Sequence, residues 1–409
     1  MSPVVPSATW RVPGRIEVLG KHTDYAGGNV LVCAATQAVT AVARPLAAHG
    51  GPRLLARSAA FPGVVALPPD ADPHLPAGHW GRYVATAWQR LRANFGDLPA
   101  AELTVDSDLP LASGMSSSSA LVVAAALALA DLAGLPETDL WASELGDDRL
   151  RWATYLAAME NGTTVGRLTG SAGVGTRGGS EDHTGMLCSE PGRLGQFGFD
   201  PVARHRHVAL PPGLVFVIGV SGVSAEKTGS AQALYNRASD AVAGALAAWN
   251  EHTGRTDRSL AAAARGEADA PTALRRIAAR AGLGDRVEHF LQESEVLVPA
   301  AADALAAGDL AAFGAVADDS QHLAETLLGN QVPQTTALAA TARELGAVAA
   351  SAFGAGFGGS VWALVPRSDA GPFASAWLER HSRAFPDQAA AASAIVTDAA
   401  AAAQRVPSV

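Results

Sequence analysis

Cysteine is nearly absent from the sequence, which has 409 residues and only two cysteines, Cys33 and Cys188. Neither cysteine lies at the spacing of a metal-binding motif, and both stand in apolar or mixed stretches. This pattern favours two buried free thiols in a reducing compartment over a disulfide or a metal site.

Positive charge and long apolar runs are also scarce. Lys and Arg number 30 against 39 Asp and Glu, the net charge is −9, and no basic cluster occurs. We therefore expect no nucleic-acid partner held through its phosphates. No stretch of about 20 apolar residues predicts a membrane span, and the first ten residues lack the pattern of a secretory signal. The expected protein is cytoplasmic, monomeric or homodimeric, and binds a small molecule.

What the chain does contain is enough apolar sequence for two domains, since 48% of its residues are hydrophobic and 17% are charged. Apolar segments bounded by Gly or Pro predict strands at 10–19, 30–43, 54–58, 102–105, 214–220 and 360–365. Longer periodic segments predict helices at 116–132, 147–159, 230–251, 287–305 and 310–328. Residues 161–180 read as loop. We place a boundary near 203–212, which gives domains 1–207 and 208–409 of a two-lobed α+β fold.

A serine run follows a glycine turn and leads directly into an apolar helix. The segment 109–120 reads LPLASGMSSSSA, with Gly114 before Ser116, Ser117, Ser118 and Ser119. The unpaired N–H groups and the dipole of a helix start attract anions, and serine hydroxyls bind phosphate or Mg²⁺. Serine also caps helices, but a cap needs one serine rather than four. The run favours a phosphate site, although no Walker A motif occurs.

Polar residues also cluster at 14–28, GRIEVLGKHTDYAGG, beside the end of a predicted strand. His22 and Asp24 are suited to bind vicinal hydroxyls, and Arg15 to face a phosphate or steady a catalytic carboxylate. A polar turn with a surface salt bridge would explain one HTD triplet. It does not explain this density of polar groups.

An acidic motif, GGSEDH at 178–183, follows the loop. A carboxylate there is suited to act as a base toward a substrate hydroxyl or to bind metal, although alone it would read as a solvated turn. If the segment is extended, Glu181 and Asp182 point in opposite directions, so we expect only one of them to serve.

A glycine cluster, GAGFGG at 354–359, matches the dinucleotide-binding fingerprint in its letters, as does the stretch 173–178. That fingerprint must follow a strand and open a helix. Residues 354–359 instead follow a helix and open a strand, so we exclude a dinucleotide-binding fold.

In this order, the motifs resemble those of the GHMP small-molecule kinases, and within them the galactokinases, over residues 11 to about 365. Segment 14–28 is similar to the galactokinase signature GRxNxIGEHTDYxxG, LPLASGMSSSSA to the central phosphate-binding motif, and SAFGAGFGGSV to the glycine motif that closes the nucleotide pocket. The resemblance implies an active site in the cleft between two lobes. It also implies transfer of the γ-phosphoryl group of ATP, with Mg²⁺, to a sugar hydroxyl, in first place the anomeric one of galactose or a relative.

The resemblance further implies roles for individual residues. Asp182 matches the catalytic aspartate and Arg15 the arginine beside it. The implied substrate-binding residues are Lys21, His22, Asp24, Gly179 and Tyr235. The implied ATP-binding residues are Trp80, Gly114, Ser116, Ser117, Ser118, Ser119 and Gly356. The implied Mg²⁺ ligands are Ser118 and Glu160, the latter on the assumption of an insertion in the glycine-rich loop.

The chain departs from the family pattern within segment 14–28, which we call the sugar motif. Lys21 replaces a glutamate that contacts the sugar in galactokinases, and Glu17 replaces an asparagine. Lys21 either favours an acidic ligand such as a hexuronate or pairs locally with Glu17, and both alternatives stay open. A serine-acidic segment common in galactokinases is also replaced, by residues 331–335.

Three other functions compete with a galactose kinase. They are a kinase for a related sugar such as a uronic acid or a pentose, a non-catalytic sugar and ATP sensor, and a GHMP kinase for a non-sugar alcohol. The intact serine run and Asp182 argue against the sensor. The HTDY segment argues against the non-sugar alcohol.

Overall fold

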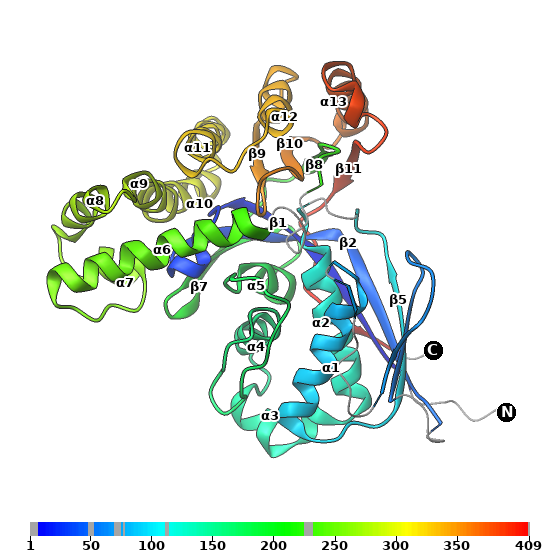
Figure 1. Cartoon of the computed structure of the whole chain (residues 1–409). Coiled ribbons are helices and arrows are strands. Elements are labelled where there is room, and N and C mark those ends of the chain that lie inside the picture. Colours follow the sequence, from blue (N-terminus) through cyan, green and yellow to red (C-terminus); the bar gives the residue numbers. More distant parts are fainter. Residues whose placement is uncertain are drawn as a thin grey trace.

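The computed structural model describes residues 7–47, 53–68, 75–76, 78–110, 114–224 and 232–407. Two β-sheets form its framework (Figure 1). In the larger sheet the strand order is β12-β1-β2-β5-β3-β4, with β6 paired to β2 and β7 to β6. Its strands are β1 (Ala8–Leu19), β2 (Asn29–Pro45), β3 (Leu54–Ser58), β4 (Val65–Leu67), β5 (Ala101–Ser107), β6 (Arg193–Phe199), β7 (Val202–Ala209) and β12 (Gln404–Val406).

The smaller sheet is antiparallel, with the order β11-β8-β10-β9. Its strands are β8 (Leu214–Val220), β9 (Ala349–Phe353), β10 (Ser360–Pro366) and β11 (Ser393–Thr397). Phe216 and Ile218 of β8 join the main core, while Val215 and Val217 face a second core built with α12 (Pro333–Glu344) and α13 (Ala370–Ala384). Because side chains alternate along a strand, two buried faces require the uninterrupted apolar run of β8.

Helices α1 (Gly81–Phe95), α2 (Ser117–Leu132), α3 (Asp139–Glu144), α4 (Arg149–Asn161) and α5 (Glu181–Cys188) belong to the first half of the chain. Helix α2 lies against β1 and β2 and also contacts α1 and α4. Its alanine-rich sequence is buried on all sides, and small side chains permit this close packing. Helix α5 packs on α4 and β1, which brings its first turn to the middle of the molecule.

The second half adds α6 (Gln232–Thr253), α7 (Leu260–Arg265), α8 (Ala270–Arg280), α9 (Gly284–Gln292), α10 (Val298–Ala307) and α11 (Leu310–Leu323). Helices α6–α9 form a smaller core of their own, on the left in Figure 1. Two π-helical turns, η3 (Glu293–Leu297) and η4 (Ala324–Leu328), follow α9 and α11. Three 3₁₀ turns complete the described elements: η1 (Asp24–Ala26), η2 (Leu135–Glu137) and η5 (Pro386–Gln388).

The predicted two-lobed α+β fold is confirmed, and each predicted strand overlaps an observed one. The predicted helix 287–305 is helical throughout, but it contains the π turn η3 between α9 and α10, which was not predicted. Pro299 explains this turn, since it lacks the N–H that an α-helix needs at that position. The prediction of two buried thiols holds for Cys33, whereas Cys188 is half-buried; both are free.

The predicted domain boundary near 203–212 falls between the strands of the two sheets in sequence. However, β12 returns to pair with β1, and the main core includes Phe216, Trp362 and Leu364 of the smaller sheet. The two lobes therefore share one core, and the division into 1–207 and 208–409 stays a prediction. Among the described residues, no helix combines the length and the apolar content that a membrane span requires.

Candidate active site

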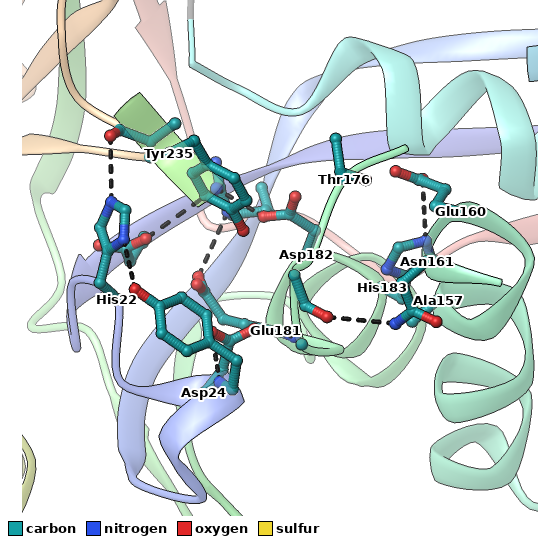
Figure 2. Close-up of a pocket in the computed structure, with 17 residues that line it drawn as sticks. His22, Asp24, Ala157, Glu160, Asn161, Thr176, Glu181, Asp182, His183 and Tyr235 are labelled. Atoms are coloured by element: carbon teal, nitrogen blue, oxygen red, sulfur yellow. Dashed lines mark hydrogen bonds and ion pairs between the residues drawn. The ribbon is translucent and has the colours of Figure 1, made fainter. Parts of the chain in front are cut away.

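A pocket lies where the sugar motif, the acidic motif and the glycine cluster meet (Figure 2). Its cavity volume is about 30 Å³, and about 510 Å³ of space is unfilled when open solvent at its mouth is included. Seven predicted site residues line it: Arg15, His22, Asp24, Glu160, Gly179, Asp182 and Tyr235. The remaining lining residues are Glu17, Tyr25, Ala157, Asn161, Thr176, Gly178, Glu181, His183, Gly354 and Ala355.

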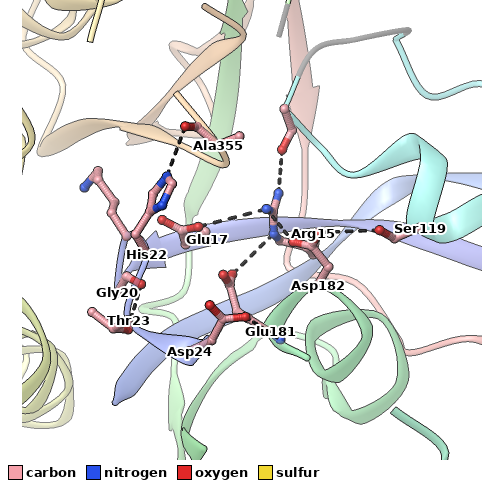
Figure 3. A network of polar contacts seen from close by, with 12 residues as sticks. Arg15, Glu17, Gly20, His22, Thr23, Asp24, Ser119, Glu181, Asp182 and Ala355 are labelled. Carbon is pink, nitrogen blue, oxygen red and sulfur yellow. Dashed lines mark hydrogen bonds and ion pairs between the residues drawn. The ribbon is translucent and has the colours of Figure 1, made fainter. Parts of the chain in front are cut away.

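Arg15 on β1 is fully buried and organises the centre of the pocket (Figure 3). Its Nη2 lies 2.5 Å from Oδ1 of Asp182, and its Nε lies 3.3 Å from Oε1 of Glu181. Its Nη1 donates to the carbonyl oxygen of Gly114 at 2.5 Å. The guanidinium therefore joins the acidic motif to the glycine turn that precedes α2.

The expectation that Glu181 and Asp182 point in opposite directions is wrong. Both residues form the first turn of α5, and both carboxyl groups reach Arg15. Acidic residues are favoured in a first helical turn, so the sequence carried a helix-start signal that the flexible loop before it obscured.

The serine run starts α2 beside this centre. Helix α2 begins at Ser117, and Ser119 Oγ donates to Oδ2 of Asp182 at 3.4 Å. Ser116 precedes the helix with a φ of 56° and does not cap it with its side chain. Its buried Oγ has no hydrogen-bond partner among the described residues. An unsatisfied buried hydroxyl at a helix N-terminus fits an incoming anion better than a capping role.

The glycine cluster approaches the phosphate motif backbone to backbone. Gly354 has a φ of 79°, and a Cβ there would lie 2.9 Å from the carbonyl oxygen of Gly114. The contact requires glycine, and it places Gly354 and Ala355 on the pocket wall. A Cβ on Gly356 would overlap Asn330, and the contact with ATP that the resemblance implies for Gly356 stays a prediction.

Asp24, Gly179 and Tyr235 line the same pocket. Oδ2 of Asp24 accepts from the backbone N–H of Glu181 at 3.2 Å, and a Cβ on Gly179 would overlap the same oxygen. Tyr235 is buried, with its ring centroid 5.4 Å from that of His22. Burial raises the pKa of Tyr235 well above its ordinary value, so the hydroxyl keeps its proton.

Both ring nitrogens of His22 are bonded to protein groups. Nε2 lies 3.0 Å from the carbonyl oxygen of Ala355, and Nδ1 lies 2.7 Å from the hydroxyl of Tyr25. Because a carbonyl only accepts, Nε2 donates and Nδ1 accepts from Tyr25. His22, predicted as a ligand of sugar hydroxyls, thus ties Tyr25 to the glycine cluster.

Lys21 does not line the pocket. Its Nζ donates to Ser320 Oγ at 2.7 Å and lies 4.0 Å from Oε1 of Glu293, the acid that begins the π turn η3. The same oxygen accepts from the backbone N–H of Gly20 at 2.8 Å. Among the described residues, the ammonium therefore pairs with Glu293 rather than with Glu17, and neither role considered from the sequence matches its placement.

Glu160 and Trp80 occupy different surroundings. Oε1 of Glu160 lies 3.1 Å from Nε2 of His183 on the pocket wall, so the predicted metal ligand shares a cavity with Asp182. Trp80 stacks with Phe61 and His79 beside the start of α1, outside this pocket. In the described part of the chain, no three His, Cys, Asp or Glu side chains are arranged to hold a metal ion.

The charges around Arg15 are unbalanced. Burial alone would lower the pKa of Arg15, but Asp182, Glu181 and Glu17 hold it above its ordinary value, so the guanidinium stays charged. Burial raises the pKa of Glu17, and burial and then Glu17 raise that of Glu181 well above its ordinary value. From the sequence, Glu17 was named as a departure from the galactokinase signature and as an alternative partner of Lys21, but not as a site residue. Its position two residues after Arg15, on the same face of a strand, was the available signal.

The chain is similar to known proteins over most of its length. Models of the galactokinase galactose-binding signature, the GHMP kinases N terminal domain and the GHMP kinases C terminal domain match residues 3–45, 82–150 and 301–383. A Mycobacterium bovis galactokinase is 30% identical over 88% of this chain and 89% of its own length. One from a Roseiflexus species is 28% identical over 90% and 86%. Lactococcus lactis galactokinase complexed with galactose has the same fold, with a TM-score of 0.81, 23% identity, and coverage of 98% of this chain and 95% of its own.

Proposed function

This chain belongs to the galactokinases of the GHMP kinase family, and we propose that its pocket transfers the γ-phosphoryl group of ATP to the anomeric hydroxyl of galactose. The observation that carries the assignment is the contact between Arg15 and Asp182, with Ser119 joining Asp182 to the start of α2. A base for the sugar hydroxyl and an anion-binding helix start thus lie within one hydrogen bond of each other.

Asp182 acts on the acceptor. Its Oδ1 faces Arg15, which favours the ionised carboxylate, and the carboxylate orients the attacking hydroxyl and accepts its proton. Phosphoryl transfer demands mainly positioning and charge stabilisation, so one well-placed base and one buried cation suffice on this side. Asp24, Gly179 and Tyr235, which line the same pocket, hold the sugar against this base.

The serine run acts on the donor. The first-turn N–H groups of α2 and the hydroxyls of Ser116, Ser117, Ser118 and Ser119 bind the phosphates, and the unsatisfied Oγ of Ser116 fits this role. Ser118 and Glu160 would hold Mg²⁺ together with the phosphates, since this ion takes few protein ligands. When bound, Mg²⁺ neutralises the charge that develops on the transferred group. Trp80 stands beside the adenine.

The charge of the pocket favours a neutral sugar over a uronic acid. The lining carries five carboxyl groups, those of Glu17, Asp24, Glu160, Glu181 and Asp182, against the single guanidinium of Arg15. The ammonium of Lys21, the one feature that favoured an acidic ligand, points to Glu293. A hexuronate would therefore meet negative charge without a free cation in the described lining.

The protein acts in the cytoplasm as a monomer or a homodimer. Its two free cysteines support a reducing compartment. Its acidic charge gives no support for a nucleic-acid partner.

The test is ADP release by the purified protein with ATP, Mg²⁺ and a panel of galactose, glucose, arabinose and galacturonate. We expect galactose to give the highest kcat/KM and galacturonate none. No ADP release with any sugar, while galactose binds in calorimetry, would leave a sugar sensor and remove the kinase.

A further inference from the structure

Two carboxyl groups beside Arg15, those of Glu17 and Glu181, have no role in the proposed function. Neither acts as the base, and neither holds the sugar. Glu17 and Glu181 are only 2% and 5% exposed, and their carboxyl groups face the same guanidinium, that of Arg15. Glu17 Oε2 lies 4.0 Å from Nη2 of Arg15, and Glu181 Oε1 lies 3.3 Å from Nε (Figure 3). Oε1 of each has no hydrogen-bond partner among the described residues.

A buried carboxyl oxygen without a donor needs a proton or a cation, because an ionised carboxylate only accepts. The surrounding charges do not remove that need. Arg15 is already engaged by Asp182, Lys21 by Glu293, and Asp24 adds further negative charge. The other titratable groups that line the same pocket are His22, Tyr25, Glu160, His183 and Tyr235, and none of them supplies a permanent cation.

Retaining one proton avoids the burial of two uncompensated negative charges. Burial raises the pKa of both carboxyl groups, in agreement with one retained proton. If both were ionised, they would compete with Asp182 for the guanidinium. With one proton between them, Glu17 and Glu181 carry a single charge. They then hold Nε of Arg15, while Nη2 of Arg15 stays paired with Asp182.

We propose that Glu17 and Glu181 share one proton and together position Arg15 against Asp182. The pair lies outside the family pattern, since Glu17 stands where the galactokinase signature has an asparagine. The positioning role rests on the proposed function of Asp182. The shared proton does not, and it can be tested without turnover.

The first experiment is infrared spectroscopy of the substrate-free protein at neutral pH. The C=O stretch of a protonated carboxyl is expected in the wild type and absent from both Glu17→Gln and Glu181→Gln. Glu160→Gln, which removes a pocket carboxyl outside the pair, is the matched control and should keep the band. A wild type without the band, or a band that persists in both pair variants, would overturn the shared proton.

The second experiment measures stability against pH by urea unfolding. An acid whose pKa is raised in the folded state stabilises the fold below its unfolded pKa, and this stabilisation is lost as pH rises through the folded pKa. One extra proton in the folded state raises the unfolding equilibrium constant about tenfold per pH unit across that window. Glu17→Gln should lose this slope relative to the wild type. Parallel pH curves for the two proteins would contradict the proposal.

Kinetics then test the positioning role separately. Glutamine at position 17 keeps the size and the polar end of the side chain, whereas alanine removes both and leaves a void beside Arg15. Glu17→Ala is therefore expected to lower kcat more than Glu17→Gln does, with the KM for ATP changed little in both. Equal losses in the two variants would overturn positioning, whereas an inactive wild type would overturn the proposed function instead.

Discussion

Nη2 of Arg15 lies 2.5 Å from Oδ1 of Asp182, and this contact joins strand β1 to the first turn of α5. The same guanidinium donates to the carbonyl of Gly114, just before the phosphate-binding helix start. One buried cation thus connects Asp182, the proposed base, to the helix start proposed to bind the donor phosphates.

Asp182→Asn tests the base directly. Asparagine keeps the size of the side chain and can accept from Ser119, but it takes no proton from the sugar. Loss of a general base lowers the rate by about 10²–10⁴-fold. We expect such a fall in kcat, measured by coupled ADP release, with galactose affinity in calorimetry close to that of the wild type.

Arg15→Lys is the companion variant, because lysine keeps the charge but has no planar fork to reach both Asp182 and Gly114. It should lower kcat as well. A fully active Asp182→Asn protein would remove Asp182 from the mechanism.

Lys21→Glu tests whether the departure at this position concerns the sugar or the fold. The change would place a second carboxyl beside the buried Glu293, and breaking a buried ion pair costs about 3–5 kcal/mol. We expect a loss of this size in urea unfolding, with the KM for galactose nearly unchanged in the protein that remains folded.

The double variant Lys21→Met with Glu293→Gln removes both charges and should be more stable than Lys21→Glu. Wild-type stability of Lys21→Glu combined with a new sugar preference would show that Lys21 acts on the ligand.

The fold was largely predictable because its strands are long apolar runs with clear punctuation. Segment 214–220 coincides with β8, and 54–58 with β3. Elements whose stability depends on distant partners were not predictable. The short strand β12 forms only because β1 offers an edge, and the π turn η3 depends on Pro299 within an otherwise continuous helical pattern.

Within the site, the sequence was sufficient to find residues that lie in dense motifs. It was not sufficient to predict the directions of their side chains. Asp182 and Arg15 were identified, yet the helical start of α5, which turns Glu181 toward Arg15 as well, was missed. The partner of Lys21 lies at position 293, and no local pattern connects positions so far apart. Side-chain direction is decided by such long-range contacts.

Gly354→Ala tests the close approach of the two glycine-bearing motifs. Alanine at a φ of 79° is strained, and its Cβ would also lie 2.9 Å from the carbonyl oxygen of Gly114, which accepts from Arg15. We expect a lower kcat and a higher KM for ATP, measured by initial rates, because the Gly114 carbonyl must shift.

Gly282→Ala is the matched control. Its φ of 72° gives a similar strain of about 1–2 kcal/mol, but a Cβ there has no neighbour within 4 Å among the described residues. The control should lose stability without losing kcat. If both variants show the same kinetics, backbone strain alone accounts for the effect at Gly354.

His22→Asn tests the connection that His22 makes between Tyr25 and the glycine cluster at 354–359. His22 has a φ of 58°, a conformation that asparagine adopts more readily than most residues, so the backbone should persist while the ring and its bonds to Tyr25 and Ala355 are lost. We expect higher KM values for both galactose and ATP. Tyr25→Phe removes one of these bonds from the other side, so the two changes should be coupled by about 0.5–3 kcal/mol in a double-mutant cycle on kcat/KM. Additive effects would mean that His22 and Tyr25 act on the substrate separately.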